Sequence, residues 1–180
     1  GTRVDQAAVD SIVAHFENKT PANPNKGIYD TDVETFGDVP DTDNDPRIVI
    51  LILNIRDGFN GSGGYVAGYY SSLNQTVLPN SNQADMMYVD GNPSNLKTAN
   101  GLENVLATFA HEFQHMIHWN YHQLSSDLTF MNEGASEVAE VVCGYPMRGQ
   151  SRYANETNKY LFNWRSNSDP NVLTDYERAP

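Results

Sequence analysis

The segment after residue 100 constrains the fold of this 180-residue chain most, because it joins a helical apolar stripe to a cluster of histidines. Asn100 is a candidate helix N-cap, and Glu103 stands three residues later, at the capping-box position. The apolar positions then recur at the spacing of one helix face. The pattern predicts a long helix whose buried face is formed by Leu102, Val105, Leu106, Phe109, Phe113, Met116 and Ile117.

Four of the five histidines lie in this predicted helix, and His111, Glu112 and His115 form the pattern H-E-x-x-H. Residues four apart lie one turn apart on the same helix face, so both imidazoles can reach one metal ion. Glu112 is rotated from His111 by about 100° and can approach a metal-bound water from the side. Zinc lowers the pKa of such a water to about 7, so that Glu112 can take its proton as hydroxide attacks a carbonyl.

A zinc site needs a third ligand, and the single cysteine, Cys143, excludes a cysteine-rich site. His118 and His122 share the helix face, but His118 lies about 10 Å along the axis from His111, too far for one ion. We therefore interpret this second pair as polar residues at the cleft end of the helix. The metzincin pattern, with glycine three and histidine six residues after the motif, fails because those positions hold His118 and Tyr121.

The remaining candidate is Glu133, on a second helix predicted over residues 128–143 and closed by Gly144 and Pro146. If this helix returns antiparallel to the first, Glu133 faces the two histidines. Glu137 lies one turn further on and could accept a hydrogen bond from the non-ligating nitrogen of a zinc-bound histidine. A pair of solvated glutamates is the alternative interpretation. The predicted packing face comprises Phe130, Gly134, Val138, Val141 and Val142.

The combination of H-E-x-x-H and N-E-x-x-S-E closely resembles the zinc motifs of the gluzincin peptidases, among which thermolysin has N-E-x-x-S-D. The string H-E-F-Q-H-M-I, with M-N-E-G shortly after, resembles more specifically the hyicolysin-like family of secreted bacterial neutral metallopeptidases. These motifs cover residues 111–137. The resemblance implies three zinc ligands: His111, His115 and Glu133. It further implies that Glu112 is the general base and that Asn132 and Glu137 support the ligands.

The same resemblance implies how a substrate binds. An extended peptide is expected to add as a strand to the one that precedes the active-site helix, here residues 85–89. Gluzincins usually stabilise the oxyanion with a tyrosine or histidine that follows the third ligand. The tyrosines available here are Tyr145, Tyr153, Tyr160 and Tyr176, and no motif selects one. We take Tyr153 and Tyr160 as the candidates.

The segments before the active-site helix predict a helix followed by strands. Residues 4–17 carry apolar positions at helical spacing, and residues 18–46 are rich in loop-forming residues. Residues 47–55 are β-branched and almost wholly apolar, which predicts a central strand buried on both faces. Residues 65–71 and 85–89 predict two further strands.

Strands first and helices later favour an α+β fold. The resemblance implies a zincin-like version, with a mixed twisted sheet, an active-site helix and a following helix that carries the glutamate. We expect one catalytic domain over residues 1–180. Residues 1–122 are expected to form an N-terminal lobe, and residues 123–180 a short C-terminal lobe with one helix near residues 153–164.

The charge balance limits the partners. Asp and Glu number 23 against 11 Lys and Arg, and a net charge of −12 argues against nucleic acid or an anionic membrane as partner. The longest apolar run, residues 48–53, is far too short to cross a bilayer. This composition suits a secreted protein that stays soluble through negative charge. We expect a monomer that acts on protein or peptide substrates.

A loop of alternating aspartates, Asp41, Asp43 and Asp45, is a candidate calcium site besides the zinc site. It is not an EF-hand, because Pro46 replaces the required glycine and Ile52 the bidentate glutamate. A solvated acidic loop explains the pattern equally well.

Two hypotheses for the function follow. The first is a zinc-dependent endopeptidase in which Glu112 activates a zinc-bound water. The second is a non-catalytic zincin-fold binding or adhesion module that retains zinc. The intact Glu112 favours the enzyme, since a binding module needs no base beside the ion. The short C-terminal lobe favours either the module or a chain in which this lobe is truncated.

Overall fold

The computed structural model describes residues 3–123 and 129–146, and it confirms an α+β arrangement with a small mixed sheet. The elements follow in the order α1 (Gln6–Glu17), α2 (Ile28–Phe36), β1 (Val49–Leu53), β2 (Gly68–Tyr70), the 3₁₀ helix η1 (Ser72–Gln75), β3 (Met86–Asp90), α3 (Ala99–His122) and α4 (Thr129–Val142). None of the helices in these residues is both long and apolar enough to span a membrane.

The sheet has the strand order β1-β3-β2, with β1 parallel and β2 antiparallel to β3. Every residue of β3 is buried, and β3 has a hydrogen-bonded neighbour on each side. β3 therefore cannot take up a peptide as an added strand, and the substrate position expected at residues 85–89 is wrong. In the described sheet, β2 is the edge strand beside α3.

β1 corresponds to the strand predicted over residues 47–55, but it is not buried on both faces. It lies at the other edge of the described sheet, where Val49 and Leu51 are 45% and 42% exposed. An apolar run shows that a strand forms, whereas the order of strands in a sheet depends on pairings distant in sequence.

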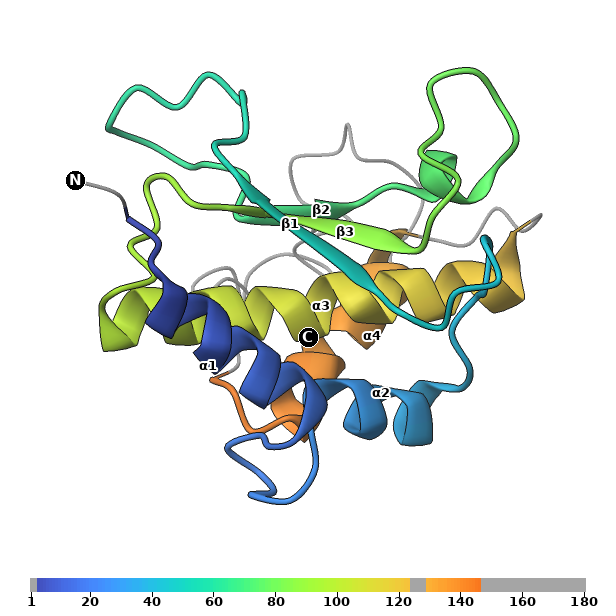
Figure 1. Cartoon of the computed structure of the whole chain (residues 1–180), viewed down its shortest axis with the longest axis horizontal. Helices are drawn as coiled ribbons and strands as arrows, with labels where there is room; N and C mark the ends of the chain where they lie inside the picture. Colours follow the sequence, from blue (N-terminus) through green and yellow to red (C-terminus); the bar gives the residue numbers. More distant parts are fainter. Residues whose placement is uncertain (1–2, 124–128, 147–180) are drawn as a thin grey trace, which may run out of the picture.

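α3 lies between the sheet on one side and α1, α2 and α4 on the other (Figure 1). This position explains why the predicted apolar stripe is buried. Phe109, Phe113, Met116 and Ile117 have no exposed surface. The stripe meets the flanking helices through aromatic contacts, with ring centroids 5.2 Å apart for Phe16 and Phe113.

α2 was not expected, because residues 18–46 carry loop-forming residues. Its sequence, IYDTDVETF, has weak intrinsic helix propensity. Tertiary contacts compensate, since Ile28 is fully buried and Tyr29 packs with its ring centroid 5.4 Å from that of Phe113. Burial thus overrides local preference in this segment.

The start of α3 differs from the predicted one. Thr98, not Asn100, is the N-cap, and its hydroxyl accepts a hydrogen bond from the Gly101 N–H at 3.1 Å. The capping box with Glu103 is therefore absent. The shift of two residues leaves the register of the buried face unchanged.

Candidate active site

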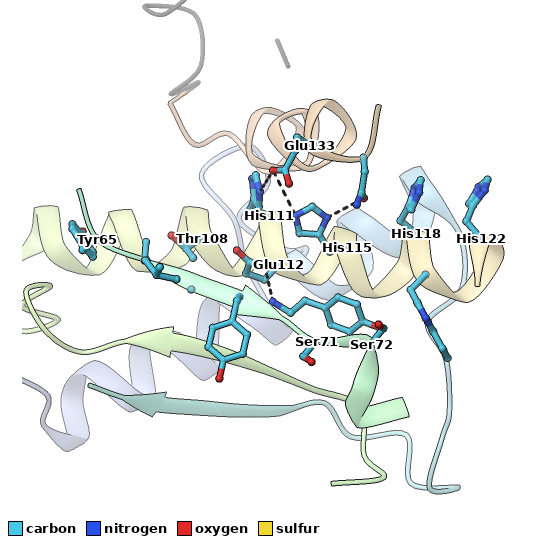
Figure 2. Close-up of a pocket in the computed structure, with 17 residues that line it drawn as sticks. Tyr65, Ser71, Ser72, Thr108, His111, Glu112, His115, His118, His122 and Glu133 are labelled. Atoms are coloured by element: carbon cyan, nitrogen blue, oxygen red, sulfur yellow. Dashed lines mark hydrogen bonds and ion pairs between the residues drawn. The ribbon is translucent and has the colours of Figure 1, made fainter. Parts of the chain in front are cut away.

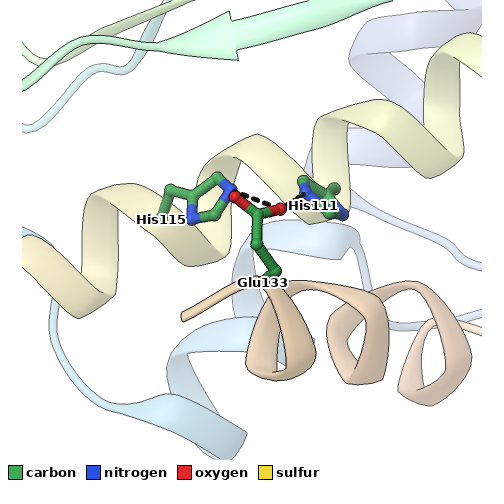
Figure 3. A group of neighbouring side chains, drawn as sticks. All are labelled: His111, His115 and Glu133. Atoms are coloured by element: carbon green, nitrogen blue, oxygen red, sulfur yellow. Dashed lines mark ion pairs between the residues drawn. The ribbon is translucent and has the colours of Figure 1, made fainter. Parts of the chain in front are cut away.

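His111 and His115 of α3 point toward Glu133 of α4 (Figure 3). Oε2 of Glu133 lies 3.4 Å from Nε2 of His111 and 3.8 Å from Nε2 of His115. Each residue offers one donor atom, and all three atoms lie within 4.8 Å of one another. α4 packs antiparallel to α3 and so brings one carboxylate close to two nitrogen donors.

The donor set fits zinc. In a tetrahedral zinc site with bonds of about 2.0–2.1 Å, neighbouring donor atoms lie about 3.3–3.4 Å apart. The distances from Glu133 to His111 and His115, 3.4 and 3.8 Å, need only a small closure to reach this value. Three protein donors of these types are also the number that catalytic zinc sites use, with a fourth position for water or substrate.

Hydrogen bonds from α4 fix the orientation of both imidazoles. Nδ1 of His111 lies 3.1 Å from Oε1 of Glu140, and Nδ1 of His115 lies 3.0 Å from Oδ1 of Asn132. Both partners are acceptors, so each ring carries its proton on Nδ1 and turns Nε2 toward Glu133. Ser136 supports the contact between the helices by donating to Oε1 of Gln114 at 2.6 Å.

Glu140 and Ser136 are the site residues that sequence reasoning missed. The sequence prediction named Glu137 as the partner of a histidine; Glu137 does lie in the same cluster, with atoms of His111, Glu137 and Glu140 within 4.8 Å of one another. The signal was available, since Asn132, Ser136 and Glu140 are spaced four residues apart and share one helix face.

The predicted apolar packing face of α4 is partly wrong. Val138 and Val141 are 37% and 41% exposed, whereas the polar residues Ser136 and Glu140 are fully buried. α4 therefore packs on α3 largely through the groups that orient the histidines. A periodicity of apolar residues alone does not identify such a polar interface.

Charges around the site set the protonation of the two imidazoles in the metal-free protein. Burial lowers the pKa of His111, but hydrogen bonds to the carboxylates of Glu133 and Glu140 outweigh it and raise the pKa to about 10. Burial lowers the pKa of His115 to about 4, assisted by the neighbouring charge on His111. Near neutral pH, His111 is therefore the protonated, positively charged imidazole, held between the carboxylates of Glu133 and Glu140, and His115 is neutral.

The side chain of Glu112 points toward β2, whereas those of His111 and His115 point toward α4. It is only 8% exposed, and its Oε2 accepts a hydrogen bond from the Tyr70 N–H at 2.9 Å (Figure 2). Gly68 permits this close approach, because a Cβ there would lie 2.6 Å from Cγ2 of Thr108 and 2.8 Å from the main-chain oxygen of Tyr88. The edge strand therefore holds the carboxylate of Glu112 in place.

A cleft of about 860 Å³ lies between β2 and the pair of helices α3 and α4. Residues 65–72 line one side, and His111, Glu112, His115 and Glu133 contribute to the other (Figure 2). His118 and His122 line the same cleft, and their rings stack with centroids 4.4 Å apart. Within the described residues, the donor cluster of His111, His115 and Glu133 does not include them.

The other predicted sites lie elsewhere. Atoms of Asp41 and Asp43 cluster within 4.8 Å with Asp85, whereas Asp45 forms a salt bridge with Arg47. Tyr153, Tyr160 and Tyr176 lie outside the described residues. Tyr145 is 4% exposed and belongs to the hydrophobic core, away from the cleft lining.

Comparison with known proteins identifies the family of the chain. The model of the family "Peptidase M30" matches residues 2–138. A neutral metalloprotease, ShpI, from Staphylococcus hyicus is 38% identical over 89 residues. That alignment covers 48% of this chain and 20% of the relative, so the chain matches about a fifth of the relative's length.

Proposed function

Because this chain belongs to the peptidase M30 family, we propose that it is a zinc-dependent endopeptidase whose active site is built from α3, α4 and β2. The family assignment confirms the hyicolysin-like resemblance of the zinc motifs. One observation carries the proposal most: two imidazole nitrogens and a carboxylate converge beside a buried glutamate that lines the same cleft.

We assign zinc binding to His111, His115 and Glu133. Zinc, when bound there, polarises the scissile carbonyl and lowers the pKa of a water molecule. Glu140 and Asn132 keep Nε2 of each histidine available by accepting the proton on Nδ1.

Glu112 acts as the general base in this proposal. Its carboxylate accepts the proton of the attacking water and then delivers it to the amide nitrogen that leaves. The Tyr70 N–H fixes the orientation of this carboxylate, to which it donates at 2.9 Å.

The peptide substrate is expected along β2, not along β3. The Asp90 N–H donates to the Ala67 carbonyl, so alternate residues of this antiparallel segment bond to β3, and Gly68 and Tyr70 direct their main-chain groups away from it. The Tyr70 N–H reaches Glu112 on that outer side, and residues 65–72 line the cleft. A substrate strand placed there lies beside both the general base and the histidines.

Other expectations from the sequence stay predictions. The negative charge suits an extracellular, monomeric enzyme. A role of Asp41, Asp43 and Asp45 in calcium binding is a prediction as well, with Asp45 turned toward Arg47 in the structure.

Cleavage of a broad library of quenched peptides by the zinc-loaded protein tests the proposal. We expect cleavage that a chelator abolishes, and a rate about 10²- to 10⁴-fold lower in Glu112→Gln, as for loss of a general base. The variant should keep its zinc, because Glu112 is not a ligand. If the wild type holds zinc and cleaves nothing in the library, the chain is better explained as a binding module.

A further inference from the structure

His118 and His122 form a second histidine pair with the spacing of the first. Both side chains lie on the same side of α3 as His111 and His115 (Figure 2). Both line the cleft, and their ring centroids are 4.4 Å apart with the planes inclined by 14°. The proposed function assigns no role to this pair.

The spacing of the second pair matches what a helix needs to bind one ion through two imidazoles. Its ring centroids are no further apart than those of His111 and His115, which are 4.9 Å apart. The rings are stacked, with their planes inclined by 14°, so binding of one ion requires one ring to turn until a nitrogen of each faces the ion.

The second pair is far enough from the first to hold its own ion. The centres of the two pairs are seven residues apart, which corresponds to about 10 Å along the helix axis, and the nearest members, His115 and His118, are about 4.5 Å apart along it. Imidazole nitrogens select zinc, copper and nickel over calcium and magnesium. Two protein ligands, completed by water, bind more weakly than the three that converge at Glu133.

We propose that His118 and His122 form a second, weaker site for a divalent transition metal, located in the substrate cleft. Both histidines line the cleft that residues 65–72 also line, so an ion held by them lies in the cleft where the peptide is expected. Zinc beyond one equivalent therefore competes with the peptide and raises KM. This consequence rests on the proposed function, whereas the metal site itself does not.

Zinc binding measured by equilibrium dialysis tests the site without reference to activity. We expect two equivalents for the wild type, one tight and one weak. His122→Gln, at an exposed position, should lower the affinity of the weak equivalent by at least about tenfold and leave the tight one unchanged. Glu133→Gln should weaken the tight equivalent and keep the weak one.

His15 provides the matched control, because it is the histidine outside α3. Its Nδ1 lies 2.8 Å from the main-chain oxygen of Ser11, on α1. His15→Gln should keep both equivalents. A wild type that binds one zinc only, or a second equivalent that persists in His122→Gln and His118→Gln, would overturn the proposal. Both outcomes are independent of whether the protein cleaves peptides.

Discussion

Replacing Glu140 by glutamine should weaken zinc binding about 10- to 100-fold. Glu140 is fully buried, and its carboxylate lies 3.1 Å from Nδ1 of His111. A hydrogen bond to a charged group contributes about 1.5–3 kcal/mol. Because tenfold in affinity corresponds to about 1.4 kcal/mol, loss of the charged acceptor accounts for about one to two orders of magnitude. Glutamine keeps the side-chain volume, so the packing of α4 on α3 is preserved.

Competition with a chromogenic zinc chelator measures the affinity, and thermal unfolding of the metal-free proteins reports whether the fold is kept. Glu137→Gln is the matched control, because it removes the same charge from the same helix and leaves the bond between His111 and Glu140 intact. We expect it to cost less affinity. If Glu137→Gln weakens zinc binding more than Glu140→Gln does, the assignment of Glu140 as the partner of His111 is wrong.

Further predictions concern the edge strand and the protons of the site. Gly68→Ala should destabilise the protein by about 1–3 kcal/mol in urea unfolding, because the added Cβ would lie 2.6 Å from Cγ2 of Thr108. Gly64→Ala, with nothing within 4 Å, is the control and should stay within about 1 kcal/mol of the wild type. Zinc binding near pH 5.5 should release about one proton, because His111, with a pKa of about 10, is protonated in the metal-free protein. His115, with a pKa of about 4, is already neutral at this pH, and a zinc-bound water with a pKa of about 7 still keeps its proton. Apparent affinity should therefore rise with pH, by up to about tenfold per unit below pH 10. Calorimetry in buffers of different ionisation enthalpy counts the protons, and release of none or of two would refute this.

The active-site helix could be predicted from the sequence because its signals are local. The stripe from Leu102 to Ile117 and the spacing of His111 and His115 both follow from the helical repeat. Glu133 could be named as a ligand because a second local pattern predicts the following helix. A short connection between two helices favours antiparallel packing, which places Glu133 opposite the two histidines.

The arrangement of the sheet could not be predicted because it depends on distant pairings. β1 carries the most apolar run of the chain, yet it lies at an edge of the described sheet, and β3 is the central strand. That order moves the expected substrate position from β3 to β2. α2 was missed for a related reason, since burial of Ile28 stabilises a helix that its own sequence favours only weakly.

The groups around the zinc ligands were only partly predictable. Asn132 was named by resemblance and lies 3.0 Å from His115, whereas Glu140 lies three residues beyond the expected Glu137. Two carboxylates on adjacent turns of one helix both come near His111, and only the crossing of α3 and α4 determines which one meets Nδ1. Similarly, the hydrogen bond from the Tyr70 N–H to Glu112 involves the main chain, so no pattern of side chains in the sequence predicts it.

X-ray absorption at the zinc edge, on protein loaded with one equivalent, tests the central claim most directly. We expect two imidazole nitrogens at about 2.0–2.1 Å and oxygen ligands at about 2.0–2.2 Å, with one imidazole lost in His115→Gln. Three or more imidazoles in the wild type would place His118 or His122 at the tight site. Sulfur at about 2.3 Å would place Cys143 there. Either result would contradict a catalytic zinc site formed by His111, His115 and Glu133.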